Sequence, residues 1–230
     1  MTLPSSPATA VSPDVRARAG MHSPVGACAA GAEALATAAD MVARGRADVV
    51  VAGADTCIRP LSSSGFDRSG VPARGNDDPA GAGRPFAAHR CGFVLAEGAA
   101  APVLERADHA RARGARVLGI LAGQGITSTG HHLTTPVGSE QARAIRRALA
   151  AAGPSPADAA HASGTPAGDY AEVRAIAEVL GPHPAVTAIK PAIGHTLGAA
   201  GALAAIVTLL SMHEDRSQPL SNLLGQRQRR

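Results

Sequence analysis

Aromatic residues and cysteines are scarce in this sequence: its 230 residues include no Trp, one Tyr, three Phe and three Cys. It has no recognisable nucleic-acid-binding motif and no aromatic side chains interleaved with basic ones, which argues against a nucleic-acid partner. The cysteines are odd in number, none of them forms a CxxC pair, and no recognisable signal peptide precedes them. These features argue against a disulfide framework and a structural zinc site. We therefore expect a protein of the reducing cytoplasm.

Long apolar runs are also absent. No run approaches the roughly 20 residues of a membrane-spanning helix, and the richest, residues 203–210, predicts a buried helix. With 45% apolar residues and 26 Gly, the interior must consist mainly of Ala, Val, Leu and Ile, which favours an α/β architecture. The net charge of +4 comes from arginines spread along the chain, with a cluster only in a predicted basic tail, residues 223–230.

Predicted strands and helices alternate, which indicates an α/β fold with helices layered around a mostly parallel or mixed sheet. The pattern predicts helices over 29–44, 139–152, 169–180 and 199–212, the third opened by Asp169 as its N-cap. It predicts strands over 48–52, 92–96, 101–104, 117–122 and 185–189, of which the first has the continuous apolar run of a buried parallel strand. The same pattern predicts a loop over residues 56–88. The prolines among residues 1–20 predict a disordered leader there.

Cys28 lies in the small-residue turn Gly26-Ala27-Cys28-Ala29-Ala30-Gly31, immediately before the first predicted helix. A thiol at a helix N-terminus faces unsatisfied N–H groups and the positive end of the dipole, which favours a reactive thiolate. A buried structural cysteine explains the local pattern about equally well. Cys57 and Cys91 lack this context, and for them a structural role is favoured.

Two histidines and one lysine form the other candidate group. His161 lies in a loop ahead of the helix predicted to start at Asp169, where a surface role is also open. Lys190 and His195 interrupt the otherwise apolar, glycine-containing segment 190–201, and buried polar groups need partners or a purpose. Lys190 is the single lysine of a chain whose other basic residues are arginines, so an ammonium is favoured over a guanidinium there, although chance retention stays open.

These segments together resemble the β-ketoacyl-acyl carrier protein synthase family, the ketosynthases or type II condensing enzymes of the thiolase superfamily. The resemblance rests on the Cys28 turn, the blocks 74–79, 84–86 and 92–98, the His161 loop and the Lys190–His195 motif, in order over about residues 24–222. It implies a partial thiolase-like fold that lacks family segments at both ends. Residues 21–110 then correspond to a remnant of the N-terminal half, and residues 111–222 to the C-terminal half.

The resemblance also implies a reaction, a decarboxylating Claisen condensation in fatty acid or polyketide biosynthesis. Cys28 would carry the acyl group as a thioester, and His161 and His195 would assist decarboxylation of a malonyl thioester and stabilise the enolate. Lys190 would maintain the field and hydrogen bonds around the histidines. The implied partners are acyl carrier protein bearing acyl and malonyl groups and a second ketosynthase-like chain, in a homodimer or heterodimer. No metal or organic cofactor is implied.

Departures from the family pattern keep an alternative open. The segment ahead of His161 is several residues short, Ala204 replaces a glutamate that pairs with the lysine, and Cys91 replaces an acidic residue. The alternative is a catalytically degenerate ketosynthase fragment that acts as an interaction partner of a complete synthase. A thiolase is disfavoured because no second cysteine lies near the C-terminus, and a chain-length factor because Cys28 is retained.

Overall fold

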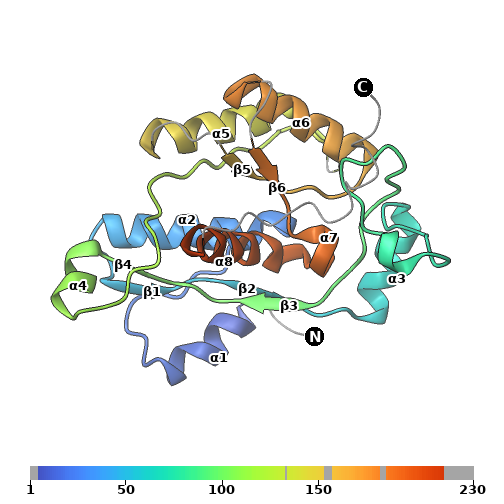
Figure 1. The fold of residues 1–230 in the computed structure, drawn as a ribbon. Coiled ribbons are helices and arrows are strands. Elements are labelled where there is room, and N and C mark those ends of the chain that lie inside the picture. Colours follow the sequence, from blue (N-terminus) through green and yellow to red (C-terminus); the bar gives the residue numbers. More distant parts are fainter. Residues whose placement is uncertain (1–4, 133, 153–156, 182–184, 215–230) are drawn as a thin grey trace. The chain divides into compact units, whose positions relative to one another are not determined.

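The computed structural model describes residues 5–132, 134–152, 157–181 and 185–214 (Figure 1). The chain forms two compact units. The first comprises Met1–Cys57, Glu97–Ile120 and Thr196–Leu210, and the second comprises Ile58–Ala96, Leu121–His195 and Ser211–Arg230. Among the described helices none is long and apolar enough to cross a membrane. The predicted basic tail, residues 223–230, lies outside the described residues.

The first unit begins with a helix where the sequence predicts a disordered leader. Helix α1 covers Ser6–Asp14 and buries no residue. Pro7 falls in its first turn, where the missing N–H has no intrahelical partner to lose, so this proline does not act as a breaker. The prediction of disorder is therefore wrong for these nine residues.

Short strands and two long helices make up the rest of the first unit. Its strands are β1 (Val49–Val51), β2 (Ala54–Thr56), β3 (Gly98–Ala100) and β4 (Val103–Glu105). Its helices are η1 (Ala27–Ala29), α2 (Ala30–Ala43), α4 (Ala107–Ala112), η3 (Leu197–Ala199) and α8 (Ala200–His213), whose last turn extends beyond the unit. The predicted helices 29–44 and 199–212 are confirmed as α2 and α8, each preceded by a short 3-10 turn.

Helices α2 and α8 pack through reciprocal glycines. A Cβ on Gly31 would lie 2.8 Å from both the Ala202 nitrogen and the Gly198 oxygen, and a Cβ on Gly201 would lie 2.7 Å from the Ala32 nitrogen. Such distances leave no room for a side chain. The two helix starts are also alike, since Ala27 and Leu197 both have positive φ, 49° and 41°. The glycines therefore set how closely these two helices approach.

The strand pairings differ from the predicted sheet. β1 pairs antiparallel with β4, β2 pairs antiparallel with β3, and only β5 (Ala157–Ala159) and β6 (Ala185–Thr187) are parallel. Val49 and Val51 are exposed, so the prediction of a buried parallel strand is wrong. An apolar run does not show which strand it will pair with. Within the described residues the mostly parallel sheet is replaced by three two-stranded pairings. No strand is assigned at 117–122, and 92–96 takes part in isolated bridges.

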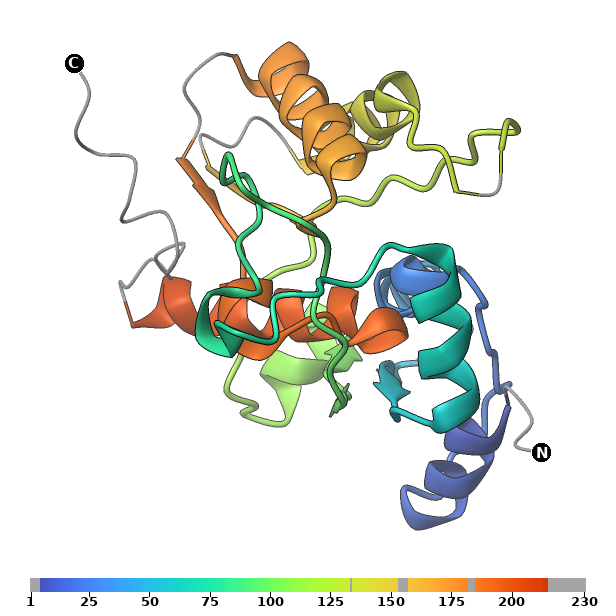
Figure 2. The same cartoon turned by 90° about the vertical axis from the view of Figure 1, so that its right-hand side faces the viewer.

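The second unit contains α3 (Pro60–Ser69), η2 (Pro79–Gly81), α5 (Gly138–Ala152), α6 (Pro166–Leu180) and α7 (Lys190–Ile193), with β5 and β6. Helices α5 and α6 lie side by side (Figure 2). The predicted helix 139–152 is confirmed as α5. The long predicted loop 56–88 is wrong over α3, which has a proline in its first turn and ends at Gly70, in the left-handed conformation that glycine favours.

The core of the second unit lies beneath the His161 loop. Ala160, Ala162, Ile176 and Ala188 are buried together, and Phe86, Ile145, Leu180 and Val186 pack around them. The residues on both sides of His161 are thus anchored in the interior, which restricts where the histidine can lie.

Candidate active site

A single extended segment, residues 92–96, holds the backbone of both histidine motifs. Val94 accepts the His195 N–H through its carbonyl oxygen (2.7 Å), and the His195 carbonyl accepts the N–H of Ala96 (3.1 Å). At the other end of the segment, the Gly92 N–H donates to the carbonyl of Gly164 (3.0 Å), three residues after His161. The motif at residue 195 and the loop after residue 161 are therefore fixed to the same strip of backbone.

The two imidazoles pack edge to face within the second unit. The ring centroids of His161 and His195 are 5.2 Å apart with an interplanar angle of 82°. The ring of Phe93 lies 4.9 Å from that of His195, also edge to face, and Phe66 of α3 continues the series at 5.7 Å from Phe93. His195 is only 2% exposed, whereas His161 presents an exposed edge. Edge-to-face contacts with Phe93 and with His161 fix the plane of the His195 ring.

Lys190, buried at the start of α7, completes the cluster. Its Nζ lies 3.3 Å from Nδ1 of His161 and also donates to the backbone carbonyl of that histidine. An ammonium only donates, so Nδ1 of His161 is the acceptor and the ring proton lies on Nε2. The lysine thereby selects one tautomer of His161.

Both histidines are held in the neutral form. The pKa of His161 is lowered, first by the burial of its ring among surrounding protein atoms although the residue keeps an exposed surface, and then by the positive charge of Lys190 and the neighbouring His195. The pKa of His195 is likewise lowered to about 3, first by burial and then by Lys190. At neutral pH each ring is therefore an uncharged donor and acceptor of hydrogen bonds.

Glu172 of α6 is a site residue that the sequence analysis did not identify. Its two carboxylate oxygens accept the backbone N–H groups of His161 and Ala162, the latter at 2.7 Å. Ala162 has a φ of 47°, a conformation that side-chain-bearing residues rarely adopt and that needs such support. The available signal was the position of Glu172, one helical turn after Asp169 and therefore on the same face of the helix.

Asp169 has a different role from the predicted helix cap. The N-cap of α6 is Thr165, whose hydroxyl accepts the Gly168 N–H (3.2 Å). Asp169, 1% exposed, instead accepts the backbone N–H groups of Phe86 (2.7 Å) and Gly164 (2.9 Å). Its Oδ2 also lies 3.4 Å from Nε of Arg90. The predicted helix 169–180 is confirmed as part of α6, but the cap assignment is wrong.

Cys28 lies in the first unit, in the middle of η1 and directly before α2. It is partly buried, and it follows Ala27, whose φ of 49° makes a sharp turn. The helix start that the sequence predicts for Cys28 is therefore present. Cys57 and Cys91 are exposed. Within the described ranges, no group of three or more His, Cys, Asp and Glu side chains could hold a metal ion.

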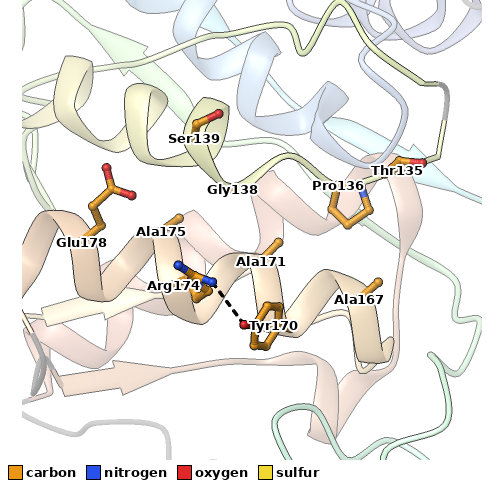
Figure 3. Close-up of a pocket in the computed structure, with 10 residues that line it drawn as sticks. All are labelled: Thr135, Pro136, Gly138, Ser139, Ala167, Tyr170, Ala171, Arg174, Ala175 and Glu178. Atoms are coloured by element: carbon orange, nitrogen blue, oxygen red, sulfur yellow. Dashed lines mark hydrogen bonds between the residues drawn. The ribbon is translucent and has the colours of Figure 1, made fainter.

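Among the described residues of the second unit, two grooves differ in how near they lie to the predicted site residues. One of about 370 Å³ runs beside Lys190 and α7 and is also lined by residues of the 79–83 and 94–96 segments. The other, of about 460 Å³, lies between α5 and α6 and contains none of the predicted site residues (Figure 3). In it Arg174 donates to the hydroxyl of Tyr170 at 3.2 Å (Figure 3). The groove beside Lys190 borders the lysine of the histidine cluster and is lined by neither imidazole.

In comparison with known proteins, the chain matches two domains of one protein family. Residues 1–110 match the N-terminal domain of β-ketoacyl synthase, including the predicted leader, and residues 118–224 match its C-terminal domain. The chain is 43% identical over 232 aligned positions to 3-oxoacyl-[acyl-carrier-protein] synthase 2 of Mycobacterium tuberculosis, covering 97% of this chain and 56% of that protein. A putative polyketide β-ketoacyl synthase of Streptomyces cyaneus is 40% identical over 94% of this chain and 54% of its own length.

Solved structures similar to this chain belong to the same family as these relatives. A β-ketoacyl synthase from Burkholderia phymatum superposes with a TM-score of 0.92 at 35% identity, over 95% of this chain and 55% of its own. A type II polyketide ketosynthase in complex with its acyl carrier protein superposes with a TM-score of 0.89 at 34% identity, over 94% of this chain and 56% of its own. The chain thus spans a little over half the length of these relatives. It has the thiolase-like ketosynthase fold over that span, and it belongs to the β-ketoacyl synthase family.

Proposed function

We propose that this chain takes part in the decarboxylative Claisen condensation of an acyl thioester with malonyl-acyl carrier protein, in fatty acid or polyketide biosynthesis. The observation that carries the proposal is the cluster of His161, His195 and Lys190, in which two neutral imidazoles pack edge to face beside one buried cation. Two neutral imidazoles supply hydrogen-bond donors for an oxygen that gains negative charge.

In the first half-reaction, the thiolate of Cys28 attacks the carbonyl carbon of the acyl thioester. The carrier thiol leaves and takes up a proton, and the acyl group is bound to Cys28 as a new thioester. The position of Cys28 at the start of α2 supports this role, because a helix N-terminus stabilises a thiolate.

In the second half-reaction, the malonyl thioester loses carbon dioxide, and the electron pair of the broken C–C bond forms an enolate. We assign stabilisation of the enolate oxygen to His161 and His195, of which His161 carries its proton on Nε2 when Lys190 donates to Nδ1. The enolate carbon then attacks the acyl carbon, and Cys28 leaves as the thiolate. Each such hydrogen-bonding role contributes about 10²–10⁴-fold in rate.

Lys190 is assigned an organising role. It holds the backbone and ring of His161, and its charge adds to the effect of burial in keeping both histidines neutral. A lysine supplies this as a compact point charge, whereas a planar guanidinium would present a different donor geometry.

The proposed partner is an acyl carrier protein. One similar solved structure is a ketosynthase in complex with its acyl carrier protein, and another is a ketosynthase with a chain length factor. By analogy we propose that this chain receives its acyl and malonyl groups from such a carrier, acts in the cytoplasm, and pairs with a second ketosynthase-like chain.

The test separates the two half-reactions. Purified chain is incubated with a radiolabelled acyl-acyl carrier protein, and protein-bound label is measured for the unmodified chain and for Cys28→Ala, with Cys57→Ala as the matched cysteine control. Label that is retained in Cys57→Ala and lost in Cys28→Ala supports the acyl-transfer step. Absence of label from the unmodified chain contradicts it and favours a catalytically degenerate partner of a complete synthase.

Release of carbon dioxide from malonyl-acyl carrier protein tests the second half-reaction. Because the proposal assigns this step to the histidines, His161→Ala and His195→Ala should each lower the rate by about 10²–10⁴-fold. His22→Ala, an exposed histidine in the first unit, serves as the control. Equal rates in all three variants would contradict the assignment.

A further inference from the structure

We propose that Arg90 is a positioning residue that sets the separation and mutual orientation of His161 and His195. Its predicted effect on reaction rate rests on the proposed function, whereas its effect on the geometry of the two histidines does not. Arg90 lies in the connection between Phe86 and Phe93, and its guanidinium reaches the first turn of α6. It thus bridges the two parts of the second unit that carry the histidine contacts.

Two nitrogens of this guanidinium donate hydrogen bonds, and the third, Nε, makes an ion-pair contact without a hydrogen bond. Nη1 donates to the carbonyl of Ala87 (2.9 Å), Nη2 donates to the carbonyl of Pro166 (3.1 Å), and Nε lies 3.4 Å from Oδ2 of Asp169. The side chain is 21% exposed and that of Asp169 only 1%, so water screens this ion pair little. Arginine has a planar guanidinium whose nitrogens point in fixed directions, and lysine has no such group.

One end of this bridge leads to His195. Two residues after Arg90, the Gly92 N–H donates to the Gly164 carbonyl, and three residues after it the Phe93 ring packs on that of His195 at 4.9 Å. A shift of Arg90 therefore moves the ring that fixes the plane of His195.

The other end leads to His161. Asp169, the charged partner of Arg90, also accepts the Gly164 N–H at 2.9 Å, three residues after His161. This stretch needs such support, since Ala162 has a φ of 47° and Phe86, whose N–H also donates to Asp169, has a φ of 62°. Arg90 thus acts on His161 through Asp169 and the backbone of its loop.

The experiment compares Arg90→Lys and Arg90→Gln with Arg74→Lys. Arg74 also pairs with an aspartate of the second unit, Asp67, at 2.9 Å, but both side chains are about 70% exposed. Histidine ring signals are followed by ¹⁵N NMR as a function of pH in the full chain, with His161→Gln and His195→Gln used for assignment. Folding of each variant is checked by circular dichroism.

Arg90→Lys keeps the charge beside Asp169 and is expected to fold, but one nitrogen does not replace the three contacts. We expect its His161 and His195 signals to shift, the pKa of both rings to rise as the displaced loop exposes them to water, and carbon dioxide release to fall about 10- to 100-fold. Arg90→Gln should show larger changes, and Arg74→Lys none. If Arg90→Gln fails to fold, Arg90→Lys alone decides.

Folded Arg90 variants whose histidine signals and titration match those of the unmodified chain would overturn the proposal, since loss of stability alone leaves these properties of the folded state unchanged. The ring signals are read without substrate. An unmodified chain without condensation activity therefore contradicts the proposed function and leaves this test intact.

Discussion

The ammonium of Lys190 binds His161 twice, once at the backbone carbonyl and once at Nδ1 of the ring, 3.3 Å away. This double contact makes one side chain responsible for both the position and the tautomer of the histidine. The same charge lowers the pKa of His161 and His195, so the consequences of removing it are specific and measurable.

Replacement of Lys190 by Met should raise the pKa of both histidines, because a nearby positive charge disfavours the imidazolium form. Burial remains the largest cause of the depression, so the titration should move upward without reaching the ordinary value of 6.5. The ¹⁵N signals of the two rings, followed against pH, report the change. Unchanged titration in Lys190→Met would show that the lysine is not charged in the folded chain.

Acid should destabilise the chain between about pH 6.5 and pH 3. In the folded state His195 stays neutral down to about pH 3, whereas in the unfolded chain it binds a proton below about 6.5. The unfolded state therefore holds more protons in this range, and the stability present above pH 6.5 is lost as the pH falls, with a limiting slope of about 1.4 kcal/mol per pH unit.

Urea unfolding of the unmodified chain and of His195→Gln at pH 7, 5.5 and 4 measures this contribution. The decrease in unfolding free energy between pH 7 and pH 4 should be smaller in His195→Gln. His22→Gln, at an exposed position, should retain the full decrease. Identical pH dependence in all three proteins would show that His195 titrates normally in the folded chain.

Glu172→Gln should destabilise the chain by about 1–3 kcal/mol, because one of the two backbone N–H groups at His161 and Ala162 would face an amide NH₂ in place of an oxygen. Glu178→Gln on the same helix is the control, since Glu178 forms an exposed ion pair with Arg146 and should cost less than about 1 kcal/mol. Urea unfolding at pH 7 gives both values. Equal costs for the two variants would contradict the proposed anchoring role.

Gly31→Val should destabilise the first unit by about 1–3 kcal/mol or more, because its side chain would collide with the backbone of Gly198 and Ala202. Gly65→Ala in α3 is the control: an added Cβ there meets nothing within 4 Å, and alanine favours a helix by up to about 1 kcal/mol. Thermal unfolding should therefore move in opposite directions for the two variants. A Gly31→Val protein as stable as the unmodified chain would show that α2 and α8 can move apart at little cost.

The helices were predictable because their signals are local. Apolar spacing and small-residue turns give the approximate limits of α2, α5 and α8, and the turn before α2 places Cys28 at a helix start. Helix α3 was not predicted because its serine-rich sequence lacks apolar periodicity, and Pro60 and the serine run after it are typical of loops. The pairing of the strands could not be predicted either, because it is a contact between segments that are distant in the sequence.

By itself, the sequence determined which chemical groups are available: a thiol at a helix start, two histidines in glycine-containing motifs and a single lysine. It also determined the family, since several motifs occur in the family's order. Only the tertiary structure decided that Asp169 binds Arg90 and two loop N–H groups, that Glu172 anchors the His161 backbone, and that Phe93 fixes His195. Spacing along a chain specifies neighbours on one helix or strand, but a contact between separate loops depends on how the whole backbone packs.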